Sequence, residues 1–132
     1  MEKINVRTNS RIDLIDITGL VQKALGKAKI KDGVCFIFCP HTTAGLTMNE
    51  NADPSVKNDI IVALSKLIPH NAGYAHNEGN ADSHIKSSIF GSSLTIFIED
   101  GKLTLGTWQG IYLCESDGPR SREVWIKVIK EI

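Results

Sequence analysis

The feature that most constrains the fold is a run of six apolar residues, Val34-Cys35-Phe36-Ile37-Phe38-Cys39. Asp32-Gly33 before the run is a turn sequence, and Pro40 ends the run. A run of this length and composition predicts a strand that is covered on both faces, with Phe36 in the core. It is far too short to span a bilayer, so we expect no membrane association.

Alternating apolar and polar residues predict further strands around Ile4 and Val6 and over 12–17, 93–99, 103–114 and 123–130. In the last of these, both faces are expected to be covered, with Trp125 and Ile129 against another subunit. Helices are predicted from an N-cap at Thr18 to about Gly26, and from Asp53-Pro54 to Pro69. Hairpin-like spacing with two main helices predicts an α+β domain built on a largely antiparallel sheet or sandwich.

No linker or repeat divides the 132 residues, so residues 1–132 are expected to form a single domain. Fifteen Lys and Arg residues balance 15 Asp and Glu residues. A basic excess is absent, which argues against nucleic acid as a partner. Three cysteines cannot all pair within the chain, and the N-terminus has no export signal; both observations favour the cytoplasm.

Polar residues follow the apolar run directly, at His41, Thr42 and Thr43. A histidine at the end of a buried strand is held where a rigid scaffold presents ligands, and the two hydroxyls could bind a phosphate. The alternative is that these side chains only form hydrogen bonds within a turn, while Asp53 serves as a helix cap.

A second polar loop, over 70–83, contains His76 and leads to Asp82 and His84. A loop this long in a small domain is usually functional or mobile. The two imidazoles could converge on one divalent ion, with Asp82 as ligand or as a group that orients a ring. Because the spacing matches no standard zinc signature, plain surface histidines remain the alternative.

A third loop carries Asp117-Gly118-Pro119, a turn sequence, followed by Arg120 and Arg122. Two guanidinium groups form a candidate phosphate site, since arginine binds phosphate in a bidentate manner. The alternative is that the arginines pair with Glu115 or Glu123. Phosphate loops and dinucleotide fingerprints are absent from the sequence.

Four segments of this chain resemble the YjbQ-like family of small proteins, and the similarity extends over nearly the whole chain. They are His41-Thr42-Thr43-Ala44-Gly45-Leu46-Thr47, Asn49-Glu50-Asn51-Ala52-Asp53-Pro54, Asn80-Ala81-Asp82-Ser83-His84-Ile85-Lys86 and Leu105-Gly106-Thr107-Trp108-Gln109-Gly110-Ile111-Tyr112. The family commonly has Asp-Ala-His where this chain has Asp82-Ser83-His84.

The resemblance implies an α+β sandwich, a homotrimer and a site near a subunit interface that holds a divalent metal, Zn or Mg. Family members are named secondary thiamine phosphate synthases, which join hydroxymethylpyrimidine diphosphate to thiazole phosphate. The metal ligands that the resemblance implies are His41, His76 and His84. For this reaction, Lys86, Arg120 and Arg122 would neutralise phosphate charge, and Glu50 or Asp82 would assist proton transfer.

Two other functions use the same loops. One is a metal-dependent hydrolase with Glu50 as base, and the other is a protein that binds a metabolite without turnover. The expected partner is a small anionic or phosphorylated substrate.

Overall fold

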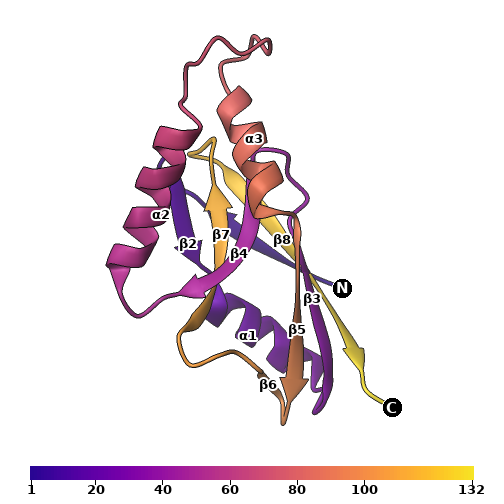
Figure 1. The fold of residues 1–132 in the computed structure, drawn as a ribbon. Helices are drawn as coiled ribbons and strands as arrows, with labels where there is room; N and C mark the ends of the chain where they lie inside the picture. The colour runs from indigo at the N-terminus through magenta and orange to yellow at the C-terminus, as the bar shows by residue number, and fades with distance from the viewer.

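The computed structural model describes all 132 residues and confirms an α+β fold (Figure 1). Three helices and eight strands follow one another along the chain. Their bounds, in order, are β1 (Glu2–Arg7), β2 (Asp13–Asp16), α1 (Thr18–Ala28), β3 (Gly33–Phe38), β4 (Ala44–Glu50), α2 (Pro54–Leu67), α3 (Ala81–Phe90), β5 (Ser93–Glu99), β6 (Lys102–Leu103), β7 (Gln109–Glu115) and β8 (Ser121–Lys130).

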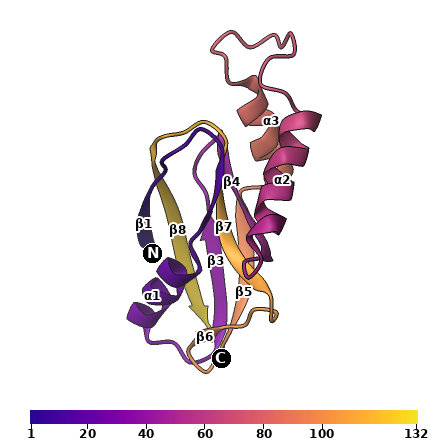
Figure 2. The same ribbon diagram turned by 90° about the vertical axis from the view of Figure 1, so that its left-hand side faces the viewer.

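The strands form two antiparallel sheets. The larger sheet has the order β1-β8-β3-β5-β6, and the smaller sheet has the order β2-β7-β4. Helix α1 lies at one end of the molecule, whereas α2 and α3 lie beside the smaller sheet (Figure 2). None of the three helices combines the length and the apolar character that crossing a membrane requires.

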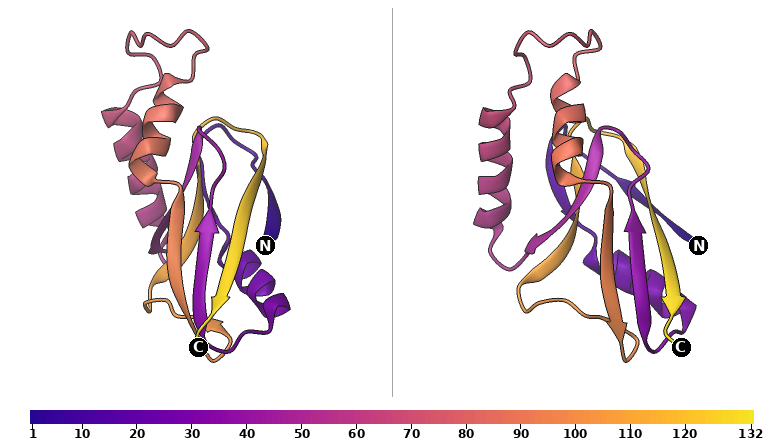
Figure 3. Two further views of the ribbon diagram at one scale, coloured as in Figure 1. Left: turned by 90° about the vertical axis from the view of Figure 1, so that its right-hand side faces the viewer. Right: turned by 45° about the vertical axis from the view of Figure 1, so that its right-hand side comes forward.

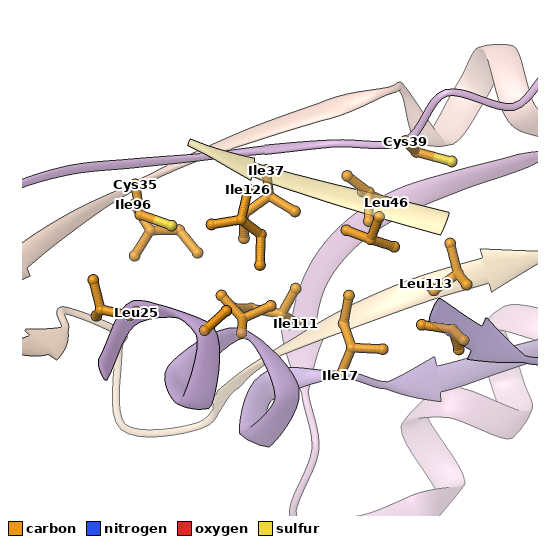
Figure 4. Packing of buried hydrophobic residues seen from close by; sticks show 14 of the residues in the cluster. Ile17, Leu25, Cys35, Ile37, Cys39, Leu46, Ile96, Ile111, Leu113 and Ile126 are labelled. Carbon is orange, nitrogen blue, oxygen red and sulfur yellow. The ribbon is translucent and has the colours of Figure 1, made fainter. Parts of the chain in front are cut away.

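The main core lies between the larger sheet and a layer made of the smaller sheet and α1 (Figure 4). Cys35 and Ile37 of β3 face Leu46 of β4 and Leu113 of β7 across this core. A second, smaller core lies on the other face of the smaller sheet, where Leu14, Tyr112 and Cys114 pack against α2 and α3. Strand β7 is therefore the strand that is covered on both faces.

The expectation that β3 is covered on both faces is wrong within this chain, whereas the cover expected for the outer face of β8 came from another subunit. Val34, Phe36 and Phe38 point away from the core, and Phe36 is 41% exposed. On the neighbouring strand β8, Trp125 and Ile129 lie on the same outer face, which no helix covers (Figure 3). The apolar run looks like a doubly buried strand because its outward residues are aromatic or branched as well.

Two elements were not predicted. Residues 44–50 form β4 rather than a loop, because their pairing with β7 compensates for a weak local pattern. Residues 81–90 form α3, a short helix that is only weakly amphipathic. Its buried residues are Asp82, Ser83 and Lys86. Polar residues on the buried face hide the helical periodicity that sequence reasoning relies on.

Two predicted boundaries also change. The cap of α1 is Ile17 rather than Thr18, since the Thr18 hydroxyl instead contacts Asp16 and accepts the N–H of Ile111. The predicted strand over 103–114 is interrupted by a turn at Gly106 to Gln109. By contrast, Asp53 caps α2 as predicted, accepting the N–H of Ser55 at 2.9 Å with Pro54 in the first helical position.

Candidate functional site

The three polar loops meet at one end of the molecule around an open hollow of about 350 Å³. The loop after β3 supplies one wall, the start of α3 with the residues before it supplies the second, and the β7–β8 turn supplies the third. No apolar core side chain lines it. The ten lining residues are Pro40, His41, Thr42, Thr43, Glu78, Asn80, His84, Asp117, Arg120 and Arg122.

Arg122 is the most buried lining residue of the hollow, with 4% of its surface exposed. It sits on β8 facing the core, where its Nε donates to Glu115 Oε1 at 2.9 Å and its Nη2 donates to Glu115 Oε2. Nη2 also donates to the Thr43 hydroxyl at 2.9 Å. The third guanidinium nitrogen, Nη1, forms no hydrogen bond within the chain. Among buried side-chain nitrogen and oxygen atoms, only Asn80 Oδ1 lacks a hydrogen-bond partner. Because Arg122 Nη1 also lacks a partner, it is not buried and retains access to solvent.

Glu115 balances the charge of Arg122 at the base of the hollow. Its carboxylate also accepts the Thr8 hydroxyl at 2.7 Å and the N–H of Asp117 at 3.1 Å. Although burial raises the pKa of Glu115, the hydrogen bonds from Arg122 and Thr8 outweigh burial and lower it below the ordinary value. The arginine–Glu115 pairing considered from the sequence is therefore present for Arg122.

His41 is held by the backbone of β8 beyond the end of β3. Its Nε2 lies 2.9 Å from the backbone N of Glu123 and 3.2 Å from the backbone O of the same residue. Burial, followed by the positive charge of Arg122, lowers the pKa of His41. The lowered pKa favours the neutral ring, and Nδ1 has no partner within the chain.

The three histidines predicted as metal ligands do not form one group. His84 lines the hollow with His41, whereas His76 lines a neighbouring hollow with His70 and Tyr74. The rings of His76 and His84 meet edge to face, with centroids 5.3 Å apart. Nowhere in the chain do three His, Cys, Asp or Glu side chains come together in a way that could hold a metal ion. The residues of a single chain thus do not fit a resident metal.

Asp82 and Lys86, predicted as a catalytic and a phosphate-binding residue, lie outside the lining of the hollow. Asp82 is fully buried and accepts from both terminal nitrogens of Arg11, at 2.9 and 3.1 Å, and from Lys86 Nζ at 3.1 Å. Burial raises the pKa of Asp82, and the hydrogen bonds from Arg11 and Lys86 lower it further than burial raises it. This three-residue cluster fixes the first turn of α3 to the segment before β2.

Arg120 and Thr42 line the hollow from its rim. Arg120 is paired with Asp117 through Nη2 and Oδ2 at 3.1 Å and is about half exposed. Asp117 also accepts from the amide of Asn80 at 2.9 Å. Burial raises the pKa of Asp117, but the hydrogen bonds from Asn80 and Arg120 lower it overall. The rim therefore combines one guanidinium, one carboxylate, one amide and the exposed hydroxyl of Thr42.

Glu50, the other predicted catalytic residue, lies at the opposite end of β4 from the hollow. Glu50 lies six residue steps along the strand from Ala44, or about 20 Å at 3.3 Å per residue. Its backbone carbonyl accepts the hydroxyl of Tyr112, and the neighbouring Asn51 donates to Asp16. An added Cβ at Gly110 would lie 2.4 Å from Asn51 Nδ2, which explains the glycine there. Two of the four family segments therefore meet at this far end, away from the hollow.

Sequence reasoning missed three residues that shape the site: Thr8, Arg11 and Asn80. Thr8 and Arg11 lie in the connection between β1 and β2, more than 70 residues from their partners, and carry no local signal. Asn80 directly precedes α3 and was hidden within a polar loop.

Comparison with known proteins gives consistent matches along the whole chain. The family model described as UPF0047 protein YjbQ-like matches residues 2–131. A UPF0047 protein of Methanocaldococcus jannaschii is 58% identical over 127 residues, covering 96% of this chain and 92% of its own. The UPF0047 protein YugU of Bacillus subtilis is 46% identical over 131 residues, covering 98% of both.

Solved structures agree with these relatives. A protein of the YjbQ/UPF0047 family from Clostridium acetobutylicum, described as uncharacterised, is 53% identical with a TM-score of 0.95. The comparison covers 98% of this chain and 100% of that one. A conserved hypothetical protein from Thermus thermophilus, 39% identical, has a TM-score of 0.92, with 98% and 100% of the two chains covered.

Proposed function

The chain belongs to the UPF0047 YjbQ-like family, and from this premise we propose that it is a transferase that forms thiamine phosphate in the polar hollow. The observation that carries the proposal is Arg122, whose guanidinium is almost fully buried and is anchored through two nitrogens, while Nη1 has no partner. An anchored guanidinium with a free edge is suited to bind a phosphate oxygen. The family resemblance supplies the reaction.

In that reaction, the ring nitrogen of thiazole phosphate attacks the methylene carbon of hydroxymethylpyrimidine diphosphate. A carbon–nitrogen bond forms, the carbon–oxygen bond to the diphosphate breaks, and the bonding electron pair leaves with the diphosphate. No oxidant is needed. Arg122 and Arg120 would stabilise the negative charge that develops on the leaving oxygens. Such stabilisation of the transition state by fixed donors is usually the largest single contribution to catalysis.

The proposed chemistry uses only the chain's own side chains. Because the three histidines do not meet, we route no step through a bound metal. Glu50 lies too far from the hollow to act there as a base, so the hydrolase alternative loses its base.

The test is formation of thiamine phosphate by purified protein from the two phosphorylated substrates, detected by oxidation to thiochrome. Arg122→Lys keeps the positive charge but loses the planar guanidinium with its several oriented N–H donors. We expect this change to reduce kcat/KM about a hundredfold. Lys23→Gln, an exposed change on α1, is the matched control. A folded wild-type protein that forms no product would overturn the transferase assignment.

Binding without turnover is the second candidate function. It is favoured by the observation that both carboxylates nearest the two arginines, Glu115 and Asp117, are already engaged in ion pairs. Calorimetry with inorganic diphosphate distinguishes the two: binding without product formation favours this second function.

We also propose that the chain forms a homotrimer through the outer face of the larger sheet. Phe97 and Ile129 flank Val34 on this face and are 61% and 52% exposed, and Phe38 packs on Trp125 with centroids 5.7 Å apart. An exposed apolar face of this kind marks an interaction surface. The number three comes from the family resemblance. Light scattering should give three times the chain mass, and Phe97→Glu should reduce it, while Val62→Glu on α2 should not.

The cytoplasm is the proposed compartment. All three cysteines are free and buried. Burial raises the pKa of Cys35 to about 11 and also raises that of Cys114, so neither thiol is a ready nucleophile. Reduced thiols that pack as small apolar side chains are compatible with a reducing environment.

A further inference from the structure

His41 has one ring nitrogen committed to the backbone. Strand β3 ends at Phe38, which pairs with Trp125 of β8, and the next stretch of β8 has no β3 backbone opposite it. The His41 ring takes that place, with Nε2 2.9 Å from the backbone N of Glu123. The backbone O of Glu123 lies farther from Nε2, at 3.2 Å. The shorter contact is to a backbone N–H that can only donate, so it favours Nε2 as the acceptor.

This contact determines where the ring proton lies. A neutral imidazole carries one proton, and with Nε2 acting as acceptor the proton resides on Nδ1. Nδ1 forms no hydrogen bond within the chain, and the ring lines the polar hollow. His41 therefore offers the hollow a hydrogen-bond donor in a fixed position.

A second donor with the same character lies on the adjacent strand. Arg122 directly precedes Glu123 and lines the same hollow, and its Nη1 is likewise without a partner within the chain. Three of the donors of Arg122 are spent on Glu115 and Thr43, so Nη1 cannot rotate freely. Two oriented donors from residues of one hollow suit two oxygens of one oxyanion.

We propose that the Nδ1–H of His41 and the Nη1 group of Arg122 together bind one phosphate group of the substrate, with neutral His41 as a hydrogen-bond donor rather than as a metal ligand or a base. This inference rests on the proposed function for the ligand class, but its central element, the tautomer of His41, is independent of any reaction. The proposed occupant is a phosphate ester, because its several oxygens can each accept from a separate donor.

The test is long-range proton–nitrogen NMR of the full-length protein with labelled histidine, recorded at pH 8.5, about two units above the ordinary histidine pKa. His41 should carry its proton on Nδ1. His70 is an internal control of the opposite kind, because its Nε2 lies 2.8 Å from the carbonyl of Gly79 and must donate. Adding inorganic phosphate should shift the His41 Nδ1–H signal and leave His70 unchanged.

Substitutions extend the test. His41→Asn places an amide N–H near the position of Nδ1, whereas His41→Gln extends its amide toward the position of Nε2. We expect phosphate affinity to stay within about threefold of wild type for His41→Asn and to fall about tenfold or more for His41→Gln, the value of one hydrogen bond to a charged group.

The outcomes separate the two proposals. A proton on Nε2 of His41, or an Nδ1–H signal that saturating phosphate does not move, overturns the inference even if thiamine phosphate is formed. A shifted Nδ1–H signal supports the inference even in a protein that forms no product, in which case only the transferase assignment fails.

Discussion

Arg122 and Glu115 form a two-point ion pair between the two sheets, with Arg122 Nε 2.9 Å from Glu115 Oε1 and both side chains almost without solvent contact. The pair closes the end of the sandwich below the hollow and also fixes the position of the free nitrogen Nη1. Stability and ligand binding therefore depend on the same side chains.

Breaking this pair from one side should destabilise the fold strongly. Glu115→Gln leaves the Arg122 charge buried without compensation, and removing one partner of a buried pair costs about 3 to 5 kcal/mol. Denaturant unfolding measures the loss. Glu123→Gln, on the same strand as Arg122 but partly exposed, is the control and should cost less than about 1 kcal/mol. Equal effects of the two changes would contradict the prediction.

Acid should destabilise the protein, in part through three carboxylates that form ion pairs. The pKa values of Asp82, Glu115 and Asp117 are all lowered in the folded state, so the unfolded state binds more protons at acidic pH. Their contribution is fully present above the ordinary carboxyl pKa, about pH 4, and is lost as the pH falls through the folded values. Unfolding free energies at pH 6, 4 and 3 should decrease in that order, and a flat profile would refute this cause.

Asp82 should behave as a structural residue. Asp82→Ala leaves Arg11 and Lys86 without their shared carboxylate, and we expect a loss of about 3 to 5 kcal/mol. Replacing Lys86 by Met in the same protein should restore part of the loss, since the buried positive charge is then removed. A fully stable Asp82→Ala protein that has lost only activity would instead support the catalytic role expected from the sequence.

Two adjacent residues of β3 should respond differently to truncation. Ile37 is fully buried, so Ile37→Ala should cost about 2 to 5 kcal/mol. Phe36 faces outward and is 41% exposed, so Phe36→Ala should cost about 1 kcal/mol in the isolated chain, less than a core position would. Thermal unfolding measures both. A larger loss for Phe36 at high protein concentration alone would point to the proposed trimer, because association couples stability to concentration.

Metal analysis tests the histidines directly. Because no three candidate ligands converge within the chain, we expect purified protein to hold metal well below one equivalent and the His76→Ala, His84→Ala double variant to hold the same amount. Elemental analysis after gel filtration gives the answer. One equivalent of metal that is lost in the double variant would show that residues of another subunit complete a site.

The strongest local patterns predicted their elements well. Asp53-Pro54 set the start of α2, and alternation at Ile4 and Val6 set β1, because cap chemistry and side-chain periodicity act within a few residues. The sequence did not predict the strand over 44–50, because pairing with β7 stabilises it rather than a local pattern. It did not predict the helix over 81–90, because that helix is held by a buried polar cluster. The partly exposed β3 was predicted as fully covered, since an apolar residue looks the same in sequence whether it faces a core or a partner.

For the candidate site, the sequence by itself determined which polar segments are candidates for chemistry: the loop at His41, the loop before His84 and the loop before Arg122. Only the tertiary structure decided which of their side chains share the hollow. It places His41, His84, Arg120 and Arg122 around one space, turns Asp82 and Lys86 into a buried ion cluster with Arg11, and leaves Glu50 at the far end of its strand. The physical reason is that the cost of burying a charge is offset by partners distant in the chain, and the sequence does not show which partner the fold brings near.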